Sequence, residues 1–350
     1  MSLSRRALLS AIALAAPAPA FAQWPFGLGR RASRAPREGR ADYAGPPLRQ
    51  QLGDWQFDQI RTAVSSRLQP VIRDAIEERF LSGVVAMPGV EAATAALAEP
   101  GGAVWTQGWT RDGTPPPAQF AWNGLERAYV ATAATQMVET GALTLEAPIT
   151  PWAPDRPNAA WITLEDLLAH TSGLPPAGGL EPQAARFQPG AAMELSLAND
   201  AVLAQILTTV DDAPLADILT KRIAERRDLR ETAFGAGDPV AVSASALDVV
   251  RFWRDLLGER MHGAQATRRR FYRLHTLAEG LTDYAGLGVR VRDLPAAQGA
   301  AADTWLYAGE ADAACLVAYS MTSRATVAIA LKGEGDPDAL ARSLLDLVRA

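Results

Sequence analysis

Residues 162–175 read ITLEDLLAHTSGLP, and this stretch decides the fold of the chain. Thr163 stands where a helix N-cap is expected, and Asp166 follows three residues later, as in a capping box. A short helix is therefore expected through Ala169. Thr171-Ser172-Gly173 has the composition of a turn, so the helix should end there.

The segments on either side of this stretch predict helices in the middle of the chain and strands at both ends. Apolar residues recur with helical spacing over 54–80, 125–140, 201–210, 215–225, 245–257 and 336–348. Strands are predicted over 90–97, 103–109, 286–292, 304–307, 315–320 and 326–331. Both ends of the chain would then share one antiparallel sheet, and a helical lobe of about 125–260 would pack beside it.

Polar residues next to these helices predict where the helices begin. Asn123 and Glu126 form a predicted capping box for the helix over 125–140. Ser245 with Asp248, and Asp336 with Pro337, mark two later helix starts. Asn199 is a candidate N-cap for 200–210.

The N-terminus has the pattern of an export signal. Arg5 and Arg6 precede an apolar stretch, and a small-residue cleavage site ends at Ala22, so residues 1–22 are predicted to be a signal peptide of the twin-arginine type. Residues 23–52 are rich in arginine, proline and glycine, which predicts a basic disordered linker. One domain is expected over 53–350, in an exported, periplasmic protein with no transmembrane anchor.

Composition argues against several classes of function. Cys315 is the single cysteine and the three histidines lack ligand spacing, so we expect neither a disulfide nor a metal, and no cofactor is implied. The net charge is −5 although the first 52 residues are basic, which leaves an acidic body. Such a body is a poor binder of nucleic acid.

The stretch 162–175 resembles the T-x-x-x-L-L-x-H-T-S-G-L signature of class C β-lactamases, D,D-peptidases and β-lactamase-like esterases. Further segments resemble the same family in the same order: 136–145, 223–234, 243–257 and 284–289. The resemblance implies an α/β fold of the α+β, β-lactamase/transpeptidase-like type. In that fold an antiparallel sheet is flanked by helices and a helical second lobe.

The resemblance also implies where a catalytic serine and lysine should stand. Members of the family use a serine nucleophile and a lysine three residues later, and these positions fall on Gly124 and Arg127. Glycine has no group to acylate, and arginine stays protonated near neutral pH. The two lysines of the chain, Lys221 and Lys332, follow Ile218 and Ile329, so no S-x-x-K occurs anywhere.

The two other family motifs are altered as well. The Y-x-N motif corresponds to Leu197-Ala198-Asn199, or to Leu195 if the count is unshifted, and its tyrosine is missing. The K-T-G or H-x-G motif corresponds to Tyr307-Ala308-Gly309, with Glu310 beyond it. We therefore expect no intact catalytic residue, with Gly124, Arg127, Leu197 and Tyr307 at the altered positions. The candidates for binding a ligand are Asn199, Tyr307, Gly309, Glu310 and Arg127.

These replacements lead to one hypothesis and two alternatives. The hypothesis is a non-catalytic protein that binds a cell-wall peptide, a β-lactam-like small molecule or a protein partner in the old cleft. One alternative is an active hydrolase with a rebuilt site, using Glu126 and Glu310 as paired carboxylates. The other is a serine hydrolase that uses Ser172 or Ser196. If the motif positions are right, Gly124 lies in the first turn of a helix that faces the cleft, and Arg127 pairs with Glu194 or Glu310 or extends into an open cleft. Tyr307 and Asn199 should then lie on the neighbouring walls.

Overall fold

The computed structural model describes residues 44, 48–50, 60, 68–176, 184–237, 239–271, 273–276, 283–296, 301–309 and 314–349. The predicted signal peptide lies outside the described residues, as does most of the predicted linker. Arg49–Gln50 form strand β1, which pairs with a strand near the far end of the chain, so the linker prediction is wrong for these two residues. A hydrogen bond to the partner strand, and a 2.9 Å ion pair from Arg49 to Asp293, hold them to the domain.

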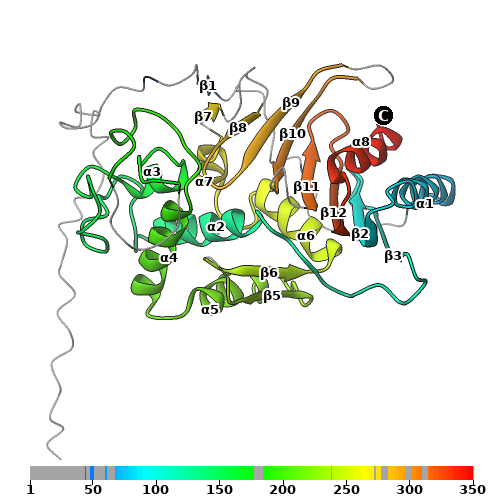
Figure 1. The fold of residues 1–350 in the computed structure, drawn as a ribbon, viewed down its shortest axis with the longest axis horizontal. Coiled ribbons are helices and arrows are strands. Elements are labelled where there is room, and N and C mark those ends of the chain that lie inside the picture. The colour runs from blue at the N-terminus through cyan, green and yellow to red at the C-terminus, as the bar shows by residue number, and fades with distance from the viewer. Residues whose placement is uncertain are drawn as a thin grey trace, which may run out of the picture. The chain divides into compact units, whose positions relative to one another are not determined.

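A nine-stranded sheet forms the centre of the fold (Figure 1), in the order β1-β7-β8-β9-β10-β11-β12-β2-β3 with every pair antiparallel. The last strand, β12, pairs with β2 near the start of the domain, which confirms that both ends of the chain share one sheet. The predicted hairpin is also present, as β2 and β3. Besides β1, the strands are β2 Val90–Ala98, β3 Val104–Thr110, β7 Arg273–Thr276, β8 Asp283–Ala285, β9 Arg290–Leu294, β10 Asp303–Ala308, β11 Cys315–Ser320 and β12 Thr326–Gly333.

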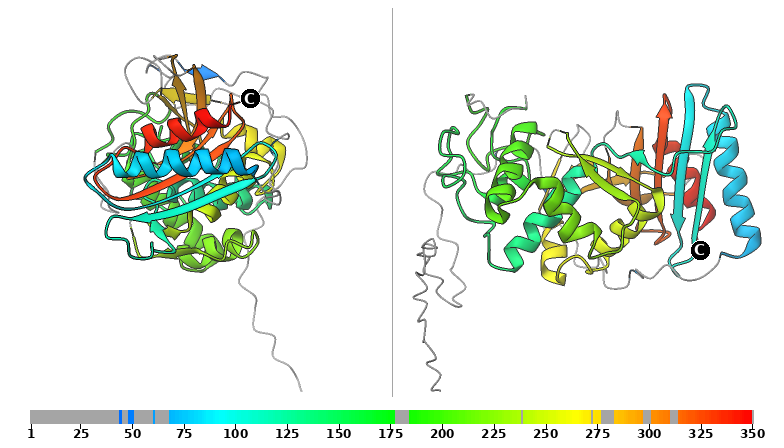
Figure 2. Two further views of the ribbon diagram at one scale, coloured as in Figure 1. Left: turned by 90° about the vertical axis from the view of Figure 1, so that its right-hand side faces the viewer. Right: turned by 90° about the horizontal axis from the view of Figure 1, so that it is seen from below.

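Helices cover both faces of this sheet (Figures 1 and 2). On one face α1 (Pro70–Val85) and α8 (Pro337–Leu347) pack side by side. On the other face lie α2 (Glu126–Glu139) and α6 (Ala246–Leu257). Their buried side chains share one apolar core with those of the helical lobe. The sheet therefore separates two apolar cores.

The helical lobe contains more strand than expected. Its helices are α3 Leu164–Leu168, α4 Leu197–Asp211, α5 Leu215–Leu219, followed by a π-helical turn Thr220–Ala224, and α7 Ala264–Arg269. Between them lies a small sheet in the order β4-β6-β5, formed by β4 Phe120–Ala121, β5 Thr232–Gly235 and β6 Ala241–Ala244. Among the described residues, no helix is both long enough and apolar enough to span a bilayer.

Three of the predicted helix starts are confirmed. Thr163 and Asp166 form a complete capping box at α3. Ser245 accepts from the backbone N–H of Asp248 at α6, and Asp336 accepts from that of Ala339 at α8. Each side chain satisfies an N–H group that the helix itself leaves without an acceptor.

Three other predictions about helix starts are wrong. The predicted helix over 54–80 is not continuous: Leu68 and Gln69 are not helical, and α1 begins at Pro70, whose missing N–H costs nothing in a first turn, and runs on to Val85. Of residues 54–67 only Ile60 is described, and it is not helical. The helix after Asn123 begins at Glu126 without any side-chain cap, because Gly124 turns the chain with φ +83° before the helix starts. Asn199 lies inside the first turn of α4, which begins after Ser196.

Candidate functional site

The turn after α3 is bonded to the start of α4 by a buried chain of side chains. The Ser172 hydroxyl donates to Asn199 Oδ1 over 2.5 Å, and Asn199 Nδ2 lies 3.1 Å from His170 Nδ1. The backbone N–H of Ser196 also points at this ring nitrogen, at 3.3 Å. Nδ1 of His170 is therefore the acceptor of a neutral ring, and Asn199 is oriented by its two neighbours.

Because of this network, the side chains of Asn199 and the nearby serines are not available to contact a ligand. Asn199 is fully buried, and both ends of its amide are engaged, so its predicted role as a ligand-binding residue is contradicted by its position. The Ser172 and Ser196 hydroxyls are also buried, and that of Ser196 donates to the Pro175 carbonyl over 2.6 Å. These three side chains bind the turn to the helix rather than face a ligand.

Gly124 lies just before α2, not in its first turn. It is buried in the turn 123–125 and has φ +83°, a conformation that glycine adopts without steric cost. Glycine thus suits both the conformation and the burial of this position.

Arg127 lies in the first turn of α2 and forms an ion pair across to α4. Its Nε donates to Asp200 Oδ2 over 3.1 Å, and the two side chains are 14% and 8% exposed. The expected partner Glu194 pairs with Arg186 instead, and the other expected partner, Glu310, lies outside the described residues. The acidic partner is Asp200 because the start of α4, rather than the loop before it, faces this turn of α2.

The end of strand β10 is connected to the turn that contains Gly124 through Cys315. Gly309 follows β10 with φ +136°, and an added side chain there would meet the Cys315 carbonyl at 2.7 Å. The Cys315 thiol in turn donates to the Asn123 carbonyl over 3.3 Å. Gly309 is therefore beside the backbone that carries Gly124.

The Tyr307 side chain, however, points to the opposite face of the sheet. It packs in the core under α1 and α8, where its hydroxyl donates to Asp283 Oδ1 over 2.6 Å and accepts from Arg292 over 3.1 Å. Burial and the Asp283 charge raise the pKa of Tyr307. The prediction that Tyr307 lies on a wall of the same cleft as Gly124 is wrong, because the neighbouring residues Leu306 and Ala308 carry the side chains of the other face.

Two residues remain exposed or charged in this region. Leu197, the first residue of α4, is 40% exposed, which is unusual for a large apolar side chain. Arg290 is the first residue of β9 and is partly exposed, and its side chain forms no ion pair or hydrogen bond with any described residue. It is paired directly with Tyr307 of β10, so the two side chains leave the sheet on the same face. Its charge adds to the lowering of the His170 pKa and partly offsets the rise of the Tyr307 pKa.

Sequence reasoning did not select Arg290. The only signal was its position directly after 284–289, one of the segments that carry the resemblance. The close contacts of Gly288 explain how this segment is placed. An added side chain at Gly288 would meet Ala131 at 2.2 Å and the Arg127 carbonyl at 2.8 Å. The turn before β9 therefore packs directly on α2, two residues before Arg290.

A family model described as Beta-lactamase matches residues 78–350. The chain belongs to the beta-lactamase family. Over 132 residues it is 29% identical to the "Putative penicillin-binding protein PbpX" of Bacillus subtilis (strain 168), and this match spans 34% of each chain.

Solved structures with this beta-lactamase-family fold include a D-amino acid amidase from Ochrobactrum anthropi SV3, with a TM-score of 0.67, 16% identity, and coverage of 79% of this chain and 98% of the amidase. A D-stereospecific amidohydrolase from Streptomyces sp. has a TM-score of 0.63 and 17% identity, with coverage of 77% and 97%. At these identities the likeness shows the shared fold.

Two buried histidines of this beta-lactamase-family chain predict that acid destabilises it. Burial, with smaller effects from Arg127 and Arg290, lowers the pKa of His170 to about 3. Burial and Arg270 lower the pKa of His262 to about 3 as well. In the unfolded chain both rings have a pKa of about 6.5, so below that value the unfolded state binds more protons, and the stability present at higher pH is lost as the pH falls.

From pH 7 to 5.5 the free energy of unfolding should fall by about 1.2 kcal/mol for each histidine. Urea unfolding across this interval measures the loss, and His262→Asn should remove about half of it. Burial raises the pKa values of Asp248 and Asp255, so these carboxyls act in the opposite direction as the pH falls, and the comparison with His262→Asn isolates the histidine contribution. A free energy of unfolding that stays level or rises between pH 7 and 5.5 would contradict the prediction.

Proposed function

We propose that this beta-lactamase-related chain is a non-catalytic, ligand-binding member of its serine hydrolase family. The observation that carries the proposal is the pair Gly124 and Arg127, which stand where the family's serine and lysine are expected. Gly124 is buried and offers no hydroxyl, and Arg127 is ion-paired with Asp200. A hydroxyl needs a neighbouring base before it can attack a carbonyl, and neither partner of that reaction is supplied here.

We base the ligand class on two groups that remain available in this part of the chain, Arg290 at the start of β9 and Leu197 at the start of α4. Arg290 is a guanidinium without an ion pair to any described residue, and a guanidinium matches a carboxylate in two parallel hydrogen bonds. Leu197 adds an exposed apolar contact. We therefore propose a ligand with a free carboxylate and an apolar side, as in a cell-wall peptide ending in D-alanine or a β-lactam-like small molecule, in preference to a protein partner.

Binding calorimetry with benzylpenicillin and with a peptide that ends in D-alanyl-D-alanine tests this proposal. Both should bind reversibly, and Arg290→Gln should weaken binding at least tenfold, about 1.4 kcal/mol, because the charge-assisted bonds to the carboxylate are lost. The same peptide with an amidated C-terminus should bind wild-type protein as weakly as the acid binds the variant. Arg226→Gln, a change at an exposed arginine of the helical lobe, is the matched control and should leave binding unchanged.

Equal affinity for the acid and the amide would overturn the assignment of Arg290. Release of hydrolysed penicillin or of free D-alanine would instead favour the alternative of an active hydrolase with a rebuilt site. The D-amino acid amidase and the D-stereospecific amidohydrolase of this fold make that control necessary.

We also propose that the chain is exported to the periplasm by the twin-arginine route. The support is the pattern around Arg5 and Arg6 and the small-residue site before Gln23. Changing both arginines to lysine should leave unprocessed precursor in the cytoplasm, as measured by fractionation and immunoblotting. Processing of the double variant at the wild-type level would reject the twin-arginine route.

A further inference from the structure

Strand β3 is an open edge of the nine-stranded sheet. It is the last strand in the order and pairs only with β2 among the described residues. Its sequence over 104–110 is VWTQGWT, without a charged residue or a proline. Natural edge strands usually carry such residues to prevent pairing, so β3 lacks the common protection against an added strand.

The hydrogen bonds of the hairpin show which backbone groups of β3 point outward. Glu99 N–H donates to the Ala103 carbonyl at one end, and Arg111 N–H donates to the Glu91 carbonyl at the other. In an antiparallel ladder alternate residues bond to the neighbour, so the odd-numbered residues of β3 bond to β2. Val104 and Thr106 therefore direct both N–H and C=O to the outside, where no described group bonds to them.

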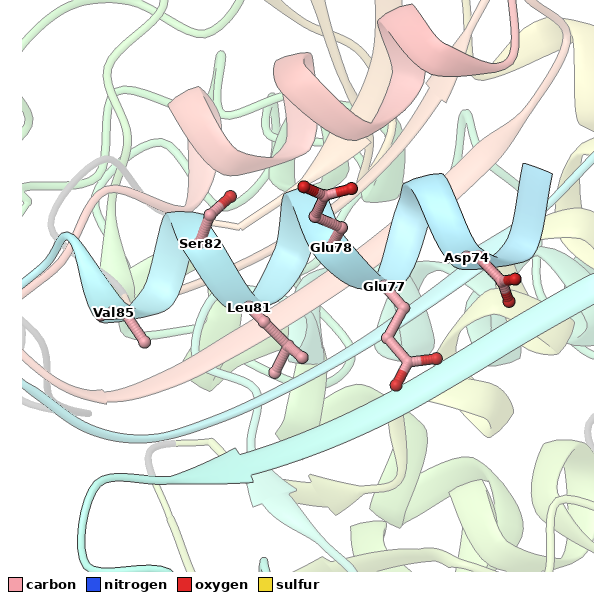
Figure 3. Close-up of a pocket in the computed structure, with 6 residues that line it drawn as sticks. All are labelled: Asp74, Glu77, Glu78, Leu81, Ser82 and Val85. Carbon is pink, nitrogen blue, oxygen red and sulfur yellow. The ribbon is translucent and has the colours of Figure 1, made fainter. Parts of the chain in front are cut away.

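Helix α1 forms a wall beside this edge. Trp105 of β3 packs edge-on against Phe80 of α1 with ring centroids 5.4 Å apart, so the odd-numbered side chains of β3 face the helix. An added side chain at Gly83 would meet Leu340 at 2.6 Å, which places α8 against the opposite flank of α1. The solvent side of α1 borders an open hollow of about 600 Å³ lined by Asp74, Glu77, Glu78, Leu81, Ser82 and Val85, of which Glu78 and Ser82 point toward α8 in Figure 3.

Figure 3 shows Glu77, Leu81 and Val85 directed away from α8 and along the same side of the helix. Positions four apart in a helix are about 6 Å apart along its axis. Alternate residues of a strand are about 6.7 Å apart, so the three side chains can meet three successive same-face side chains of an added strand. Val85 is 59% exposed, and neither Glu77 nor Glu78 forms an ion pair with any described residue.

We propose that the edge of β3 and this flank of α1 form a docking site for an extended, basic segment of a partner protein. The segment would add a strand to β3 through the outward groups of Val104 and Thr106. A basic side chain at one position would meet Glu77, and apolar side chains two and four residues along would meet Leu81 and Val85. This site is separate from the ligand site proposed above.

Charge argues against a second copy of the chain as the occupant. Antiparallel pairing of two β3 edges about a two-fold axis would bring both α1 helices to one face of the joined sheet. The strand that each copy would offer the other is β3 itself, which has no basic residue over 104–110 to meet Glu77. A basic strand has the complementary charge.

The probe for this site is a fluorescein-labelled, C-terminally amidated peptide, Thr-Arg-Thr-Val-Thr-Val-Thr, whose binding to the full mature chain is followed by fluorescence polarisation. Thr106→Pro should weaken binding at least tenfold, because it removes an outward N–H that the hairpin does not use. Thr106→Val keeps the N–H and is the matched control. Replacing the peptide's arginine by glutamate should weaken binding to wild-type protein about threefold and strengthen it for Glu77→Lys.

A version of the probe that is N-methylated at alternate residues tests strand pairing without altering the protein, and it should not bind. Three results would overturn the proposal: Thr106→Pro binding as tightly as Thr106→Val, the N-methylated probe binding as well as its parent, or the acidic probe matching the basic one. Sedimentation that shows a dimer in the wild type and a monomer in Thr106→Pro would also overturn it, since the occupant would then be a second copy.

Discussion

Incubation with a fluorescent penicillin should leave no covalent adduct on this protein. Loss of the nucleophile lowers the rate of a serine hydrolase by on the order of 10⁶, because the catalytic groups act as a unit. Gly124 has no hydroxyl, and the hydroxyls of Ser172 and Ser196 are buried and donate to Asn199 and Pro175. Intact-mass spectrometry after prolonged incubation measures the outcome directly.

A stable mass increase that maps to a serine would contradict the non-catalytic proposal. Ser172→Ala and Ser196→Ala then serve as matched controls, because each removes one candidate hydroxyl. If either variant abolished labelling, that serine would be the nucleophile and the alternative of a relocated serine would stand. A penicillin-binding relative from the same family, labelled in parallel, shows that the reagent is active.

Asp200→Ala should lower the free energy of unfolding by about 3 kcal/mol. The change removes the carboxylate to which Arg127 Nε donates, in a pair whose side chains are 14% and 8% exposed, and removal of one partner of a mostly buried pair is strongly destabilising. The double change Arg127→Met with Asp200→Leu removes both charges and should recover most of the loss. Urea unfolding at pH 7 provides the comparison.

The matched control is Asp228→Asn, which breaks a surface ion pair to Arg230 whose side chains are 82% and 72% exposed. Exposed ion pairs contribute little to stability, so the free energy of unfolding of this variant should lie within about 0.5 kcal/mol of the wild-type value. If Asp200→Ala were as mild as Asp228→Asn, Arg127 would not depend on Asp200 for its charge balance. The account of this part of the site would then be wrong.

Local signals in the sequence predicted the elements of the fold well. Thr163, Ser245 and Asp336 each bond to backbone groups two or three residues away, so their effect can be read without knowing the rest of the chain. The pairing of β12 with β2 followed from the order of strands and helices together with the resemblance. Asn123 failed as a cap because the positive φ of Gly124, a single backbone angle, moved the helix start.

Side-chain direction and partners at the site were harder to predict. All but one residue of β10 are buried, because helices cover both faces of the sheet there, so its pattern does not reveal which face Tyr307 occupies. The pairing of Arg127 with Asp200 depends on how α2 and α4 meet, 73 residues apart in the chain. Such long-range packing leaves no periodic signal in the sequence.

The Gly124 turn also bears on what can evolve from this sequence. A serine at 124 would need the left-handed conformation of the present turn, at a cost of about 1 kcal/mol or more, or a rebuilt turn. A lysine at 127 would be a shorter and differently hydrated cation opposite Asp200. A serine at 124 without a lysine at 127, or the reverse, would lower stability and supply no activated nucleophile, so neither substitution is favoured alone. Selection acting one mutation at a time therefore meets a stability cost at the first step toward a Ser–Lys pair.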